Sequence, residues 1–101
     1  MATIGNLRTA LNKLIRALRD HEIFSLPNDI QQAWTEMVLE ASELSARLDD
    51  ASASSPQYAE VIELLNVATA AIRSANSASS ARAALAAARR ALTRLRQVLG
   101  V

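Results

Sequence analysis

The chain contains a single histidine, His21, which is its first candidate for acid–base or metal chemistry. An imidazole can act as a general base near neutral pH or ligate a metal ion. A metal site needs further ligands at suitable spacing, and the sequence has neither a cysteine nor a Glu-x-x-His pair. At a helix end, a histidine also interacts favourably with the helix dipole. We therefore predict no metal site, no catalytic residue and no enzymatic activity.

Carboxylates at helical spacing are the second candidate, because Glu36, Glu40 and Glu43 recur at steps of four and three residues. Residues with this spacing share one face of a helix. Without a histidine partner they do not indicate a di-metal site. Two interpretations remain: a solvated acidic stripe, or a surface that pairs with nearby arginines.

Arginines are the third candidate, because residues 79–99 hold five arginines and no acid. Guanidinium groups bind phosphate in a bidentate manner, so a basic stripe predicts polyanion binding. Two observations argue against polyanion binding: no aromatic residues lie between these arginines, and the net charge of the chain is only +1. Polyanion binding therefore ranks third among the predicted functions, and nucleic acid is not the expected partner. The basic residues concerned are Arg8, Lys13, Arg16, Arg19, Arg82, Arg89, Arg90, Arg94 and Arg96.

Helices must position these side chains, because apolar residues recur at alternating steps of three and four along four segments. Pro27 and Pro56 are typical of first helical turns, and Gly100 is typical of a helix end. The pattern predicts helices at residues 3–20, 27–50, 56–75 and 79–99. We expect one all-α domain over residues 1–101, an antiparallel up-down-up-down four-helix bundle.

Short connections in such a bundle predict which helices are neighbours. We expect the basic helices 3–20 and 79–99 to lie side by side, and likewise the acidic helices 27–50 and 56–75. The longest apolar runs are too short for a membrane span. We expect no membrane contact and a cytoplasmic location.

The expected function is a non-enzymatic interaction module that binds a protein partner or a second copy of itself. Helix 56–75 carries apolar residues beyond its own seam, and aligned exposed apolar residues indicate a partner helix. Charged faces on the last helix would contribute to the contact. The predicted partner-binding residues are Leu64, Val67, Ala71, Arg82, Arg89 and Arg90.

The alternative function is a carrier of a small apolar ligand or a haem-like cofactor inside the bundle. The seams place three alanines in one central layer, which predicts either close packing or a cavity. A Cys-x-x-Cys-His haem motif is absent, which leaves His21 and Met37 as the only axial-ligand pair to consider. No resident cofactor is expected. The residues of this alternative site are His21, Trp34, Met37, Ala41, Ala68 and Ala88.

Overall fold

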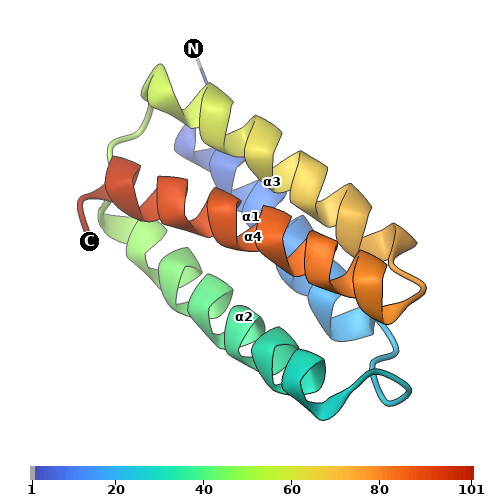
Figure 1. Ribbon diagram of the computed structural model, residues 1–101. Helices are drawn as coiled ribbons and strands as arrows, with labels where there is room; N and C mark the ends of the chain where they lie inside the picture. Colours follow the sequence, from blue (N-terminus) through green and yellow to red (C-terminus); the bar gives the residue numbers. More distant parts are fainter. Residues whose placement is uncertain (1) are drawn as a thin grey trace.

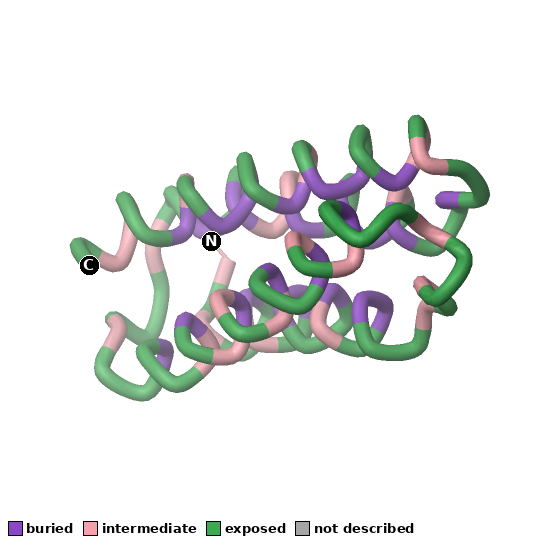
Figure 2. The backbone as a smooth tube through the Cα atoms, turned by 60° about the horizontal axis from the view of Figure 1, so that its bottom comes forward, coloured by how far each residue is buried: buried purple, intermediate pink, exposed green. Residues whose placement is uncertain are grey.

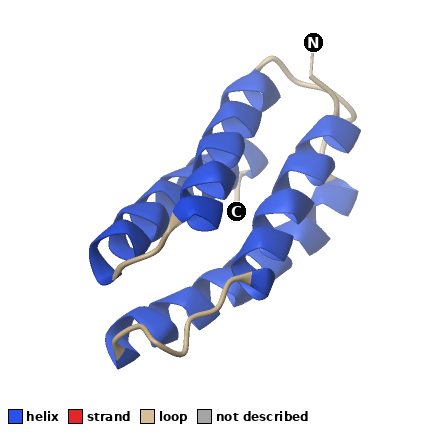
Figure 3. Cartoon of the chain, turned by 90° about the vertical axis from the view of Figure 1, so that its right-hand side faces the viewer, coloured by secondary structure: helices blue, strands red, loops and turns tan. Residues whose placement is uncertain are grey.

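The computed structural model describes residues 2–101, which form four long helices joined by loops (Figures 1 and 3). The helices are α1 (Ile4–Asp20), α2 (Asn28–Arg47), α3 (Gln57–Ser74) and α4 (Ala78–Leu99). A 3₁₀ turn, η1 (Leu48–Asp50), extends α2. The chain is an all-α four-helix bundle, and the helix bounds predicted from periodicity are confirmed to within three residues.

Local hydrogen bonds explain where the helices begin and end. The Thr3 hydroxyl accepts from the Asn6 N–H at 3.2 Å and caps α1. At α4, the Ser77 hydroxyl accepts from the Ser80 N–H at 3.1 Å while the Ser80 hydroxyl accepts from the Ser77 N–H at 2.9 Å. This reciprocal capping box starts α4 one residue earlier than predicted. Gly100 ends α4 with a φ of 75°, a conformation that favours glycine.

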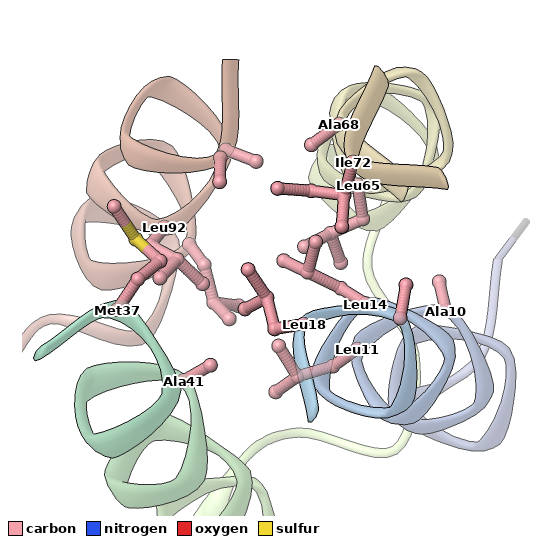
Figure 4. Packing of buried hydrophobic residues seen from close by; sticks show 14 of the residues in the cluster. Ala10, Leu11, Leu14, Leu18, Met37, Ala41, Leu65, Ala68, Ile72 and Leu92 are labelled. Atoms are coloured by element: carbon pink, nitrogen blue, oxygen red, sulfur yellow. The ribbon is translucent and has the colours of Figure 1, made fainter. Parts of the chain in front are cut away.

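Consecutive helices run in opposite directions, but the expected neighbours are wrong. The helix pairs in contact are α1–α2, α3–α4, α1–α3 and α2–α4. Figure 4, which looks along the bundle, shows α1 diagonal to α4 and α2 diagonal to α3. Loop 51–56 makes this arrangement by crossing between diagonal helices. The loop passes the start of α1, where the Ile4 N–H donates to the Ala53 carbonyl at 2.8 Å.

The charges of the helices give the physical reason for the diagonal order. Over their bounds, α1 and α4 carry +3 and +5, while α2 and α3 carry −3 and −1. The observed order gives each basic helix two acidic neighbours, whereas the predicted order would place like-charged helices together. The cross-helix salt bridges follow this order and are Arg8–Asp49, Arg82–Asp29, Arg94–Glu60 and Arg96–Glu40.

The core is a single cluster of buried hydrophobic side chains contributed by all four helices. Figure 2 shows the buried segments on the inner sides of the helices, and Figure 4 shows labelled side chains that point inward. Ala41, Ala68 and Ala88, the alanines of the predicted central layer, each have 0 % exposure. Close approach of the helices suits these small residues. None of the helices described has the length and apolar character needed to cross a membrane.

Candidate protein-binding groove

The arginines of α4 separate into those that pair within the bundle and those that do not. Arg82 and Arg96 lie on the flank toward α2, where Arg96 Nη2 is 3.1 Å from Glu40 Oε1. Arg94 lies toward α3, with its Nε 3.1 Å from Glu60 Oε1. Arg89 and Arg90 are exposed, and within residues 2–101 neither has a carboxylate within salt-bridge distance. Two strong cationic donors on α4 are therefore available to an external acid.

The two unpaired arginines border a solvent-open groove of about 520 Å³ on the outer surface of α3 and α4. Leu64 and Ala86 supply its apolar surface, and the methyl group of Thr93 adds to it. We call this feature the α3–α4 groove, and its lining residues are Glu60, Leu64, Ala86, Arg89, Arg90, Thr93, Arg94 and Gln97. The fold thus joins an apolar surface to a cationic border.

Three of the predicted partner-binding residues meet in this groove: Leu64, Arg89 and Arg90. The other three do not line it. Arg82 pairs with Asp29 of α2, with 3.5 Å between Nη2 and Oδ2. Val67 is 57 % exposed, and Ala71 is half-buried.

Of the three apolar residues on α3 that were predicted to face a partner, Val67 is exposed, whereas Leu64 and Ala71 are only partly exposed. Leu64 and Ala71 are half-buried and pack against the core. On α4, Arg82 and Arg96 lie on the flank that faces α2. The opposite flank carries Ala84 and Ala91, both with 0 % exposure. Such small residues let α3 approach α4 closely, so part of the apolar surface of α3 is used within the bundle.

His21 and Trp34, which the cofactor hypothesis placed together, are indeed neighbours. Their ring centroids lie 5.1 Å apart with a tilt of 36°. The Trp34 indole N–H donates to the Leu18 carbonyl at 2.8 Å, in the last turn of α1. This bond satisfies a carbonyl that the end of the helix would otherwise leave without a partner. The arrangement is a helix cap between α1 and α2, which the sequence analysis missed.

A second exposed apolar feature lies beside this cap. Phe24, in the loop between α1 and α2, is 84 % exposed. With Ile23, Trp34 and Val38 it lines a smaller depression of about 290 Å³. No acidic residue lines this depression, and its basic residues are Arg19 and His21, so its chemistry does not specify a partner.

The remaining cofactor candidates lie in the interior. Met37 is 1 % exposed, and together with Ala41, Ala68 and Ala88 it belongs to the packed core. None of these four lines either depression described above. Among residues 2–101, no three histidine or carboxylate side chains gather as a metal site. Ligand uptake at the central layer stays a prediction.

Comparisons with protein-family models, with curated proteins and with solved structures give no match for this chain. The geometry of its own surface therefore carries the functional argument.

Proposed function

We propose that this protein is a non-enzymatic interaction module that binds an acidic amphipathic helix of a protein partner in the α3–α4 groove. The observation that carries the proposal is the position of two unpaired arginines, Arg89 and Arg90, beside the apolar surface of Leu64 and Ala86. An amphipathic helix offers both complementary parts, because its apolar side chains fill a groove and its acids pair with flanking cations.

The arginines supply orientation and the groove supplies apolar contact. A guanidinium group binds a carboxylate through two parallel hydrogen bonds, which fixes the geometry of the partner. Arginine is also enriched among the residues that dominate the binding energy at interfaces. Charge pairs at the border of an interface mainly set the association rate and its salt dependence. Binding through this groove should therefore weaken as salt rises.

The apolar surface favours a protein partner over a polyanion. A phosphate backbone needs cations along its length but gains nothing from an apolar lining residue such as Leu64. The diagonal placement of α1 and α4 also separates the two basic helices, which the polyanion hypothesis had joined into one surface. Polyanion binding through the α1 and α4 arginines consequently remains the lesser prediction.

A direct test uses a fluorescent synthetic helix with leucines on one face, flanked by glutamates, and a second peptide with lysines in place of the glutamates. Fluorescence anisotropy should show that the protein binds the acidic peptide and does not bind the lysine peptide. Arg89→Glu with Arg90→Glu should weaken that binding by roughly tenfold or more. Leu64→Gln, which changes no charge, should weaken it several-fold.

The matched charge control is Arg16→Glu with Arg19→Glu on α1. Both residues are exposed, and this double variant changes the net charge by the same amount as Arg89→Glu with Arg90→Glu does. The half-buried Ile15, replaced by glutamine, is the control for Leu64→Gln. Equal losses in the control and groove variants would refute the groove as the site. Heparin binding that is insensitive to Leu64→Gln, with no peptide binding, would favour the polyanion prediction instead.

A further inference from the structure

The outer face of α2 carries an exposed leucine between two acids. Leu39 is 60 % exposed and is one of the few large hydrophobic residues that the fold leaves at the surface. Glu36 precedes it by three residues and Glu43 follows it by four, so all three lie on one stripe of the helix surface. We call Glu36, Leu39 and Glu43 the α2 acidic stripe.

Among the acids of α2, those of this stripe form no salt bridge within residues 2–101. On α2, Asp29 and Glu40 form salt bridges with arginines of α4. Glu36 and Glu43 are exposed and form none with the residues that the structure describes. Within residues 2–101, the one side-chain hydrogen bond of Glu36 is a long one, which its Oε1 accepts from Gln32 Nε2 at 3.5 Å. One acidic face of the bundle thus has spare carboxylates, while one basic face has spare guanidinium groups.

We propose that the α3–α4 groove binds the α2 acidic stripe of a second copy of this chain. This inference rests on the proposed function, because it names the partner that the α3–α4 groove binds. Leu39 would enter the groove beside Leu64 and Ala86, with Glu36 and Glu43 facing Arg89 and Arg90. This is the same arginine–glutamate chemistry that joins neighbouring helices inside the bundle, where Arg94 and Glu60 pair across α4 and α3.

The length of the groove accommodates the stripe, but the charges of the two surfaces are spaced differently along their helices. A helix rises about 1.5 Å per residue, so the two acids of the stripe lie roughly 10 Å apart along α2. On α4 the groove extends from Ala86 to Gln97, which corresponds to roughly 17 Å. Arg89 and Arg90 are consecutive residues, only about 1.5 Å apart along α4, so their long side chains have to diverge along the groove to reach both carboxylates.

The contact joins two different surface patches, which sets the kind of assembly. A heterologous contact of this type either closes into a ring or continues as an open chain. One exposed helix stripe in one groove makes a small interface, so the association should be weak. Because the charged groups are exposed, salt should dissociate the assembly.

The experiment measures the molar mass of the full chain by sedimentation velocity over a wide concentration range at low and high salt. The stripe variant is Glu36→Lys with Glu43→Lys, and the groove variant is Arg89→Glu with Arg90→Glu. All four positions are exposed, and circular dichroism checks that each variant keeps its helices. We expect the wild-type mass to rise with concentration at low salt and each variant alone to stay monomeric.

An equimolar mixture of the two variants is the decisive sample. The stripe variant retains a native groove and the groove variant retains a native stripe, so the mixture should associate although neither component does alone. The control is the double variant Arg16→Glu with Arg19→Glu, which should associate with itself as the wild type does.

A wild-type chain that stays monomeric at all concentrations, or a mixture that fails to associate, would overturn the inference. Binding of the acidic peptide separates this failure from failure of the proposed function. The stripe variant should still bind the peptide, because its groove is intact. Peptide binding without self-association would leave the proposed function standing with another partner, whereas absence of both would remove the groove as a binding site.

Discussion

Replacement of Trp34 by phenylalanine tests the hydrogen bond that ends α1. Trp34 is 1 % exposed, and its indole N–H is the donor to the Leu18 carbonyl at 2.8 Å. Loss of the donor leaves a buried carbonyl without a partner, which costs about 1–3 kcal/mol. The smaller ring leaves unfilled volume against the core and adds about 1 kcal/mol. Together these terms predict a loss of about 2–4 kcal/mol in the free energy of unfolding.

The assay is urea unfolding followed by far-UV circular dichroism, supported by thermal melts. A domain of this size changes its Tm by about 4–8 °C per kcal/mol, so the melt should shift down by roughly 10 °C or more. Phe24→Leu is the aromatic control, because Phe24 is 84 % exposed and its replacement should change stability by less than about 0.5 kcal/mol. A Trp34→Phe variant as stable as Phe24→Leu would refute the cap.

Three further substitutions test other parts of the bundle, each by the same unfolding assay. Ala88→Leu should lower the free energy of unfolding by about 1–3 kcal/mol, because Ala88 has 0 % exposure and the larger side chain overpacks the core. A neutral or stabilising effect would instead indicate a void in the central layer. Tyr58→Phe should lose about 1 kcal/mol, because its hydroxyl donates to the Ser52 carbonyl at 2.7 Å; no loss would contradict that bond. Ser77→Ala should lose about 1 kcal/mol by breaking the capping box, and an unchanged midpoint would show that α4 does not need it.

Periodicity was sufficient to predict the helices and the core. Leu7, Leu14, Leu65 and Leu92 belong to the apolar residues that recur at steps of three and four, and all have 0 % exposure. The heptad pattern decides these positions because one apolar stripe per helix has to leave water. Helix ends were also readable where the cap residues are distinctive, as at Thr3 and Gly100.

The order of the helices around the bundle was predicted wrongly, although a usable signal was present. Loop 51–56 is long enough to join either adjacent or diagonal helices, so connection length did not decide between them. The alternation of basic and acidic helices favours the diagonal order. Arg82 and Arg96, read as part of a basic surface, instead pair with acids of α2 in that order.

The candidate site was only half predictable for a related reason. Leu64 was predicted because it is apolar and lies outside the seam, and Arg89 and Arg90 because they are charged. That these three residues meet in one groove depends on how α3 packs on α4. Ala86 and Thr93 line the same groove and carry no signal of their own in the sequence. The Trp34 cap joins residues sixteen positions apart, and periodicity does not report the direction of an indole N–H.

The most direct test of the proposed function is a heteronuclear NMR titration of the labelled protein with the acidic amphipathic peptide. Binding in the α3–α4 groove predicts salt-sensitive shift changes that centre on Ala86–Gln97 and on Leu64, with little change along the outer face of α1. Changes centred instead on Arg16 and Arg19, or on the loop around Phe24, would contradict the account, as would a spectrum that does not change.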